Sequence, residues 1–264
     1  MARPLKKVIL FLVEGPSDQE ALFVPISKLY HAIDPQILIR FQVMVDRDRR
    51  DRSKIHKGGD ITSKYGVKEE NIEKLMNDLY FYPFFSANYI YPKDIVEVVH
   101  VVDLDGAFIP PEAVVEDPTC EETIYTDTGI CANDRALIVE RNDHKQTNLI
   151  HLSQINTIKA KSKKVPYSVY YMSCNLDHFI HGQRNMEDRL KVDAAKKFSR
   201  ECSKNMQHFY DTFLVGNGCV TDLNYAGSWS FIQEGLNSLN AHTNLNLLIE
   251  RLQSEAASVR GEIK

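Results

Sequence analysis

Two short acidic motifs in this chain carry side chains of the type that binds metal ions. Glu14 and Asp18 follow one apolar run, and Asp103 and Asp105 follow another. Carboxylate oxygens are the ligands that hard cations such as Mg²⁺ and Mn²⁺ prefer. The two motifs therefore predict a divalent-metal site with Mg²⁺ or Mn²⁺ as the cofactor.

The apolar pattern predicts the elements that would position these acids. Continuous apolar and β-branched runs predict buried strands over residues 7–13, 37–45, 95–102 and 167–173. Apolar residues at helical spacing predict helices over residues 18–31, 69–80, 186–215 and 229–260. Strands that alternate with helices are typical of an α/β fold, with a mostly parallel sheet covered by helices on both faces.

The carboxyl ends of parallel strands meet at one edge of a sheet, where ligands of such folds bind. Glu14, Asp103 and Asp105 all fall at strand ends, and in extended geometry the two aspartates point the same way. Three carboxylates at one edge repel each other unless a cation lies among them. An alternative interpretation is that both residues stabilise the N-terminus of the following helix, Glu14 through its charge and Asp18 through N-capping, and bind no metal.

Charge is distributed unevenly along the chain although the net charge is only −4. Residues 69–140 hold 16 acidic and three basic residues, whereas 47–57 and 141–164 each hold six Lys or Arg. Basic segments beside an acidic one suit a metal site that binds a polyanion, although they could also be solvated loops. The predicted nucleic-acid contacts are Arg47, Arg49, Arg50, Lys145, Lys161, Lys163 and Lys164.

Composition excludes several classes of protein. A chain of 264 residues with 43% hydrophobic residues can form a full core. Its five cysteines form no CxxC pair, which argues against a structural zinc site and a secreted disulfide scaffold. The first apolar run is too short for a signal peptide, and no run is long enough to span a membrane. We therefore expect a cytoplasmic protein without a membrane partner.

The two motifs resemble those of the Toprim domain, which occurs in topoisomerases, primases and OLD-family nucleases. The resemblance rests on Glu14-Gly15-x-x-Asp18 and Asp103-x-Asp105-Gly106, each after a buried strand. The segment Ser173-Cys174-Asn175-Leu176-Asp177-His178 resembles the strand exit of RloB-like Toprim proteins, with Asp177 where that family usually has Glu. The resemblance covers residues 5–182, with inserts near 46–67 and 109–164. Residues 186–264 would form a helical C-terminal extension.

The resemblance implies a Toprim-like, Rossmann-like fold and a metal-dependent nuclease that cleaves DNA or RNA. It implies Glu14, Asp103 and Asp105 as catalytic metal ligands, with Asp18 and Asp177 completing the metal site. RloB-like proteins are often paired with a separate ATPase in anti-phage or abortive-infection systems, and the same partner is implied here. Leucines at 247, 248 and 252 are interpreted as core or helix-pairing residues, and the second interpretation allows a homo-oligomer.

Three alternatives to this interpretation stay open. Asp103-Leu104-Asp105-Gly106 also resembles the nucleophile loop of haloacid-dehalogenase phosphatases, in which Asp103 would be phosphorylated and Asp105 would act as acid and base. A Toprim fold could also serve as a scaffold or regulatory subunit without catalysis. Finally, Asp46-Arg47-Asp48 is a second Asp-x-Asp after a predicted strand and could supply the metal ligands.

Overall fold

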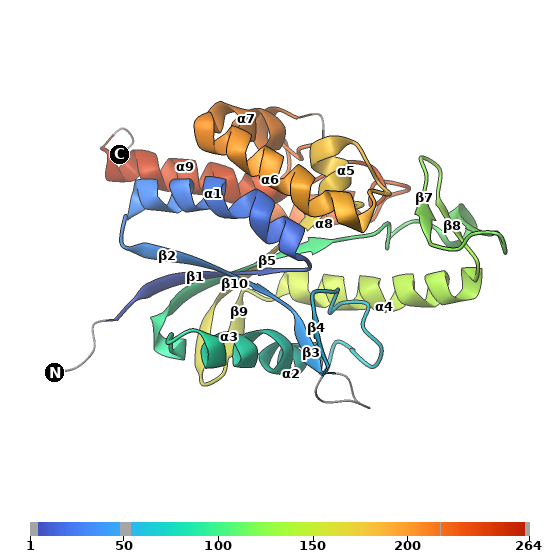
Figure 1. Ribbon diagram of the computed structural model, residues 1–264, viewed down its shortest axis with the longest axis horizontal. Helices are drawn as coiled ribbons and strands as arrows, with labels where there is room; N and C mark the ends of the chain where they lie inside the picture. Colours follow the sequence, from blue (N-terminus) through green and yellow to red (C-terminus); the bar gives the residue numbers. More distant parts are fainter. Residues whose placement is uncertain (1–4, 48–53, 217, 262–264) are drawn as a thin grey trace.

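The computed structural model describes residues 5–47, 54–216 and 218–261, and a five-stranded sheet lies at its centre (Figure 1). The strand order is β2-β1-β5-β10-β9, in which the first four strands are parallel and β9 is antiparallel to β10. The bounds are β1 Lys7–Val13, β2 Ile37–Val43, β5 Ile95–Asp103, β9 Thr157–Ala160 and β10 Lys163–Met172. The predicted α/β architecture with a mostly parallel sheet is confirmed.

The inner strands are apolar along most of their length because helices cover both of their faces. Every residue from 8 to 13 in β1 is buried. The register of the parallel pairs aligns Val13 with Val43, and Asp103 with Met172. The carboxyl ends of β1, β5 and β10 therefore finish near one another, and the residues that follow them emerge at one edge of the sheet.

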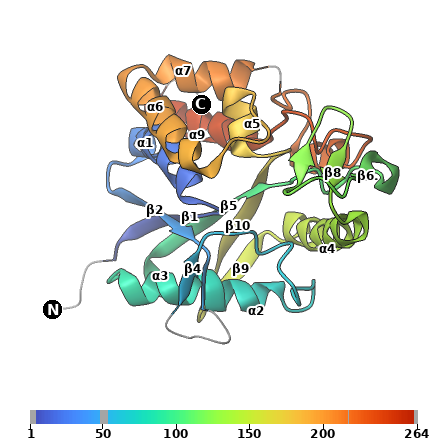
Figure 2. The same ribbon diagram turned by 45° about the vertical axis from the view of Figure 1, so that its right-hand side comes forward.

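One face of the sheet is covered by α1, α6, α7, η4 and α9, which form the upper layer in Figures 1 and 2. Their bounds are α1 Pro16–Ile33, α6 Asp188–Lys204, α7 Met206–Tyr210, the π-helix η4 Asp211–Val215 and α9 Leu245–Val259. The buried residues on this side form one cluster that includes Phe11 and Val99 of the sheet together with Leu22, Phe198 and Leu248 of the helices. The C-terminal helices therefore share a core with the strands that carry the acidic motifs.

The opposite face is covered by α2, η1, α3 and α4, which lie below the sheet in Figure 1. Their bounds are α2 Ile72–Met76, the π-helix η1 Asn77–Phe81, α3 Tyr82–Ala87 and α4 Arg135–Gln154. Two further helices are α5 Leu176–His181 and α8 Tyr225–Phe231, and short 3₁₀ turns are η2 Pro92–Asp94 and η3 Pro111–Ala113. Trp229 of α8 packs edge-on against Tyr171 of β10, which ties the C-terminal part to this core as well.

Short strands build two smaller sheets outside the main one. The hairpin of β3 (Val45–Arg47) and β4 (Ile55–Lys57) follows β2. A three-stranded sheet of β6 (Val114–Glu116), β8 (Ile130–Ala132) and β7 (Ile124–Tyr125) lies between β5 and α4. These two units fall within the predicted inserts near 46–67 and 109–164.

Several predicted elements differ from the structure in extent. The predicted helix 186–215 is divided after α6, because the Asn205 side chain accepts a hydrogen bond from the Gln207 backbone N–H and starts α7 there. The π-helix η4 then follows α7 without a break. The predicted helix 229–260 is interrupted by turns between α8 and α9. In the described part of the chain, no helix combines the length and the apolar character that crossing a membrane requires.

Candidate functional site

Five predicted acidic residues line one cleft of about 820 Å³ at the carboxyl edge of the sheet. Glu14 directly follows β1, Asp103 ends β5, and Asp105 lies in the turn after it. Asp18 lies in the first turn of α1 and Asp177 in the first turn of α5. The fold therefore brings together residues that are up to 163 positions apart in the sequence.

Backbone groups hold the two strand-end acids in place. The Asp103 N–H donates a hydrogen bond to Glu14 Oε1 at 3.0 Å, so the ends of β1 and β5 are joined through the acid itself. The Leu176 N–H donates to Asp103 Oδ1 at 3.1 Å from the start of α5. The Gly59 N–H donates to the Glu14 carbonyl oxygen at 2.9 Å. These contacts position the acids through backbone N–H groups of three different segments.

Asp105 does not continue the strand, so the prediction that Asp103 and Asp105 alternate in extended geometry is wrong. Asp105 has a φ of +50° and Gly106 a φ of +66°, which places both residues in the left-handed region. The Asp105 N–H donates to the Cys174 carbonyl oxygen at 2.9 Å, and this bond stabilises the turn. The turn still directs Asp105 into the same cleft as Asp103.

Lys145 is placed differently from its predicted role as a surface contact for nucleic acid. Its side chain has no exposed area, and its Nζ donates to Asp105 Oδ2 at 2.7 Å. The same ammonium lies 2.9 Å from Asp60 Oδ2, a carboxylate in the loop after β4. Lys145 is therefore a buried cation of the acidic cluster, and sequence reasoning did not identify Asp60 as its partner.

This buried ion pair changes the pKa values of its members. Burial alone would raise the pKa of Asp60, but the Lys145 ammonium and hydrogen bonds from Thr62 and Ser63 outweigh it and lower the pKa. Burial alone would lower the pKa of Lys145, but Asp105 and Asp60 outweigh it and raise the pKa well above its ordinary value. Both groups are therefore held in their charged forms.

Four other acids of the cleft have raised pKa values, which disfavours their anionic forms. Burial, followed by repulsion from Asp60, raises the pKa of Glu14 well above its ordinary value. Burial and the nearby Asp18 do the same to the pKa of Asp103. Burial raises the pKa of Asp18 to about 6 and also raises the pKa of Asp177. A cation among these carboxylates would relieve both the desolvation and the repulsion, so their donor set suits a hard divalent metal.

The walls of the cleft carry basic side chains, two of which lie outside the basic segments identified in the sequence. Lys57 comes from β4, whereas Arg184 and Lys191 come from the segment after α5 and from α6. Glu122, Thr123 and Tyr125 form another part of the lining. The charge pattern could not single out Arg184 and Lys191, because each is isolated among residues of mixed charge, whereas Lys57 ends the basic segment 47–57.

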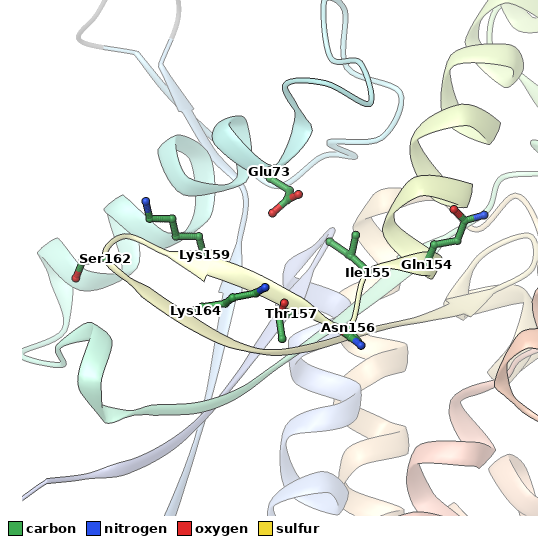
Figure 3. A pocket seen from close by; sticks show the side chains of 8 residues that line it. All are labelled: Glu73, Gln154, Ile155, Asn156, Thr157, Lys159, Ser162 and Lys164. Carbon is green, nitrogen blue, oxygen red and sulfur yellow. The ribbon is translucent and has the colours of Figure 1, made fainter.

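The predicted basic residues 161, 163 and 164 lie on the hairpin of β9 and β10, at the other end of the sheet from the acids. Lys163 Nζ donates to the carbonyl oxygen of Ile95, the first residue of β5, at 2.7 Å. Asp103 ends the same strand eight residues later, so at about 3.3 Å per residue the two ends are about 26 Å apart. Figure 3 shows Lys159 and Lys164 beside a separate hollow that Glu73 also lines. Lys161, Lys163 and Lys164 therefore do not face the acidic cleft.

Of the predicted basic residues 47, 49 and 50, the structure describes only the first. Arg47 is the last residue of β3, and Arg49 and Arg50 lie outside the described residues. Asp46, from the alternative Asp-x-Asp pair, forms an ion pair with Lys64 and is not among the residues that line the acidic cleft. Asp48 lies outside the described residues.

Comparisons with known proteins identify no relatives of this chain. No protein-family model matches it, and neither a curated protein nor a solved structure gives a significant match. A functional conclusion therefore depends on the geometry of the cleft and on the resemblance of the acidic motifs.

Proposed function

We propose that this chain is a metal-dependent nuclease with a Toprim-like catalytic core that cleaves phosphodiester bonds in DNA or RNA. The observation that carries the proposal is the convergence of Glu14, Asp18, Asp103, Asp105 and Asp177 on one cleft. Burial raises the pKa of four of these acids, which is the arrangement expected of a cation site in the absence of its cation. Mg²⁺ or Mn²⁺ is the cofactor that we propose.

Glu14, Asp103 and Asp105 would hold the metal, with Asp18 and Asp177 as further ligands. When bound, the metal would polarise the scissile phosphate and lower the pKa of an attacking water. The main-chain bonds to Glu14 and Asp103 keep the ligands in position without substrate. Glu14 is also the general base in this proposal, because its carboxylate lies in the cleft and is held beside Asp103.

Three basic side chains in the lining of the acidic cleft support a polyanionic substrate. Lys57, Arg184 and Lys191 line the cleft from three different segments, and each can contact a phosphate oxygen. A separate ATPase partner and an abortive-infection setting are proposals that rest on the resemblance alone. A cytoplasmic location is proposed from the composition, and self-association from the leucines at 247, 248 and 252.

The decisive experiment compares the wild type with Asp103→Asn on plasmid DNA and on a total tRNA pool, with Mg²⁺ or Mn²⁺. Asparagine keeps an oxygen that accepts the Leu176 N–H but removes the charge, so the fold should be retained. Loss of an outer partner of a metal ligand already costs about 10–100-fold, so we expect loss of a ligand to slow cleavage more than about 100-fold. Binding of Mn²⁺, measured by calorimetry, should weaken in parallel.

The matched control is Asp193→Asn, because Asp193 is an exposed aspartate on α6 outside the cleft. Cleavage by Asp103→Asn at the wild-type rate would overturn the assignment, and so would a wild type that neither binds Mn²⁺ nor cuts either polymer. Hydrolysis of p-nitrophenyl phosphate without polymer cleavage would favour the phosphatase alternative, although that reaction leaves Glu14 and Asp18 without a role.

A further inference from the structure

The small sheet between β5 and α4 brings two cysteines together that have no metal-binding spacing in the sequence. Cys120 lies in the loop after β6, and Cys131 is the middle residue of β8. Their sulfur atoms are 3.1 Å apart. A carboxylate oxygen of Asp117 completes a group of three ligand atoms that all lie within 4.8 Å of one another. Main-chain pairing brings these segments together, because Cys131 pairs with Val115 and the Asp117 N–H donates to the Ala132 carbonyl oxygen at 2.9 Å.

Local hydrogen bonds fix the Asp117 carboxylate near the two thiols. Asp117 Oδ1 accepts hydrogen bonds from the Thr119 N–H at 2.8 Å and from Thr119 Oγ1 at 2.7 Å, which orients the carboxylate. The Cys120 N–H donates to the Asp117 carbonyl oxygen at 3.0 Å, so a tight turn holds these two ligands together. Cys120 is buried, while Cys131 and Asp117 are half-buried, which leaves a route for an ion to enter.

We propose that Asp117, Cys120 and Cys131 bind one Zn²⁺ ion, with water as the fourth ligand. Soft thiolates select zinc over magnesium, so this site is chemically distinct from the carboxylate cleft. Binding converts two thiols to thiolates and releases two protons, and no electrons are transferred. Two Zn–S bonds of about 2.3 Å at a tetrahedral angle place the sulfurs about 3.8 Å apart, so a small rotation of the cysteine side chains would suffice.

The unit that carries these three ligands has little apolar core of its own. The surrounding apolar cluster is small and consists of Ile109, Val114, Ile130, Cys174 and Leu239. Small loop-rich units with little core are commonly stabilised by a structural metal.

The proposed zinc site lies close in sequence to one wall of the acidic cleft. The loop that Asp117 and Cys120 begin leads to Tyr125, which lines the cleft. Arg141 connects this wall to the turn that carries Asp105, because it donates to the Tyr125 hydroxyl at 3.2 Å and to the Asp105 carbonyl oxygen at 2.9 Å. Zinc would thus anchor one wall of the cleft, and this inference holds whether or not the chain is a nuclease.

Cobalt substitution of the full chain tests the proposal directly. Co²⁺ added to the reduced wild type should give a sulfur-to-cobalt charge-transfer band, which carboxylate ligands of the cleft cannot produce, and Zn²⁺ should abolish the band at one equivalent. Cys120→Ser and Cys131→Ser should each lose at least half of the band. Asp117→Asn should weaken zinc affinity by about tenfold or more. Cys219→Ser is the matched control, because Cys219 is a half-buried free cysteine outside the cluster, and it should retain the full band.

A reduced wild type without the charge-transfer band would overturn the proposal, as would a band that persists in both cysteine variants. A Cys120–Cys131 disulfide that reforms during the titration, in place of metal binding, would overturn it too. If circular dichroism shows that a cysteine variant is unfolded, the wild type is tested instead by the protection that zinc gives its thiols against a thiol reagent. Zinc should then slow the reaction of two thiols with a thiol reagent, and no slowing would count against the site.

Discussion

Replacing Lys145 with methionine tests whether the buried ion pair holds the acidic cluster together. The Lys145 side chain is fully buried and contacts Asp105 at 2.7 Å and Asp60 at 2.9 Å. Methionine fills a similar volume but leaves two carboxylates without their shared cation. Breaking a buried pair by removing one partner costs about 3–5 kcal/mol. At about 2–4 °C per kcal/mol for a chain of this size, the melting temperature should fall by about 6–20 °C.

The loss should depend on pH in a defined direction. In the wild type, the lowered pKa of Asp60 contributes stability that is present above its ordinary value of 3.8 and is lost as the pH falls through the folded pKa. The raised pKa of Lys145 contributes stability that is present below 10.5 and is lost at higher pH. Without the ammonium, burial raises the pKa of Asp60, and protonation then relieves the cost. The difference between variant and wild type should therefore shrink from pH 7.5 to pH 5.

The assay is urea denaturation in a chelator at both pH values. Lys196→Met on the exposed side of α6 is the control, and it should change stability by less than about 0.5 kcal/mol. Asp60→Asn combined with Lys145→Met should recover part of the loss, because it removes one unpaired charge. A loss below about 1 kcal/mol for Lys145→Met, or one that does not shrink at pH 5, would refute the reasoning.

Three further changes test other parts of the structure. The raised pKa of Asp18 makes wild-type stability fall as the pH rises through about 6. Asp18→Asn in a chelator should therefore stabilise the chain by up to about 3 kcal/mol at pH 7.5 and by almost nothing at pH 4. Equal stability of the two proteins at pH 7.5 would contradict this. Burial lowers the pKa of His100 to about 4, so the wild type should lose up to about 3 kcal/mol of stability as the pH falls from 6.5 to 4. His100→Asn should not show this loss in matched urea titrations. Parallel dependence of stability on pH in the two proteins would count against this reasoning. Gly129→Ala places a Cβ 1.9 Å from the Ala113 carbonyl oxygen and should lower stability by about 1–3 kcal/mol. Thermal denaturation measures this loss, and an unchanged melting temperature would show that the contact relaxes freely.

Local patterns were sufficient to predict the central strands and the acids at their ends. The run that becomes β1 is apolar throughout because it is buried on both faces, so the pattern is visible without knowledge of its neighbours. Glu14 and Asp103 follow such runs directly, and the rule that parallel strands finish at one edge brings them together. Helix ends were predicted less well, because a capping side chain such as Asn205 interrupts a continuous apolar pattern.

The partners of the predicted residues depended on contacts between distant segments. Nothing in the sequence around Lys145 distinguishes a surface lysine from a buried one, because its burial results from Asp60, which lies 85 residues earlier, and Asp105. Likewise, the lysines at 161, 163 and 164 belong to a basic run. They lie in the turn between β9 and β10 and at the start of β10, at the end of the sheet opposite the acids.

The sequence by itself determined the α/β class and the set of acids at the strand ends, since both follow from periodicity and from residues adjacent in the chain. Only the tertiary structure decided which charges face one another, that Cys120 meets Cys131, and that the C-terminal helices complete the core over β1 and β5. These features depend on strand register and on helix packing between segments far apart in the chain. Such contacts are selected by the burial of the whole core, and short sequence patterns do not record them.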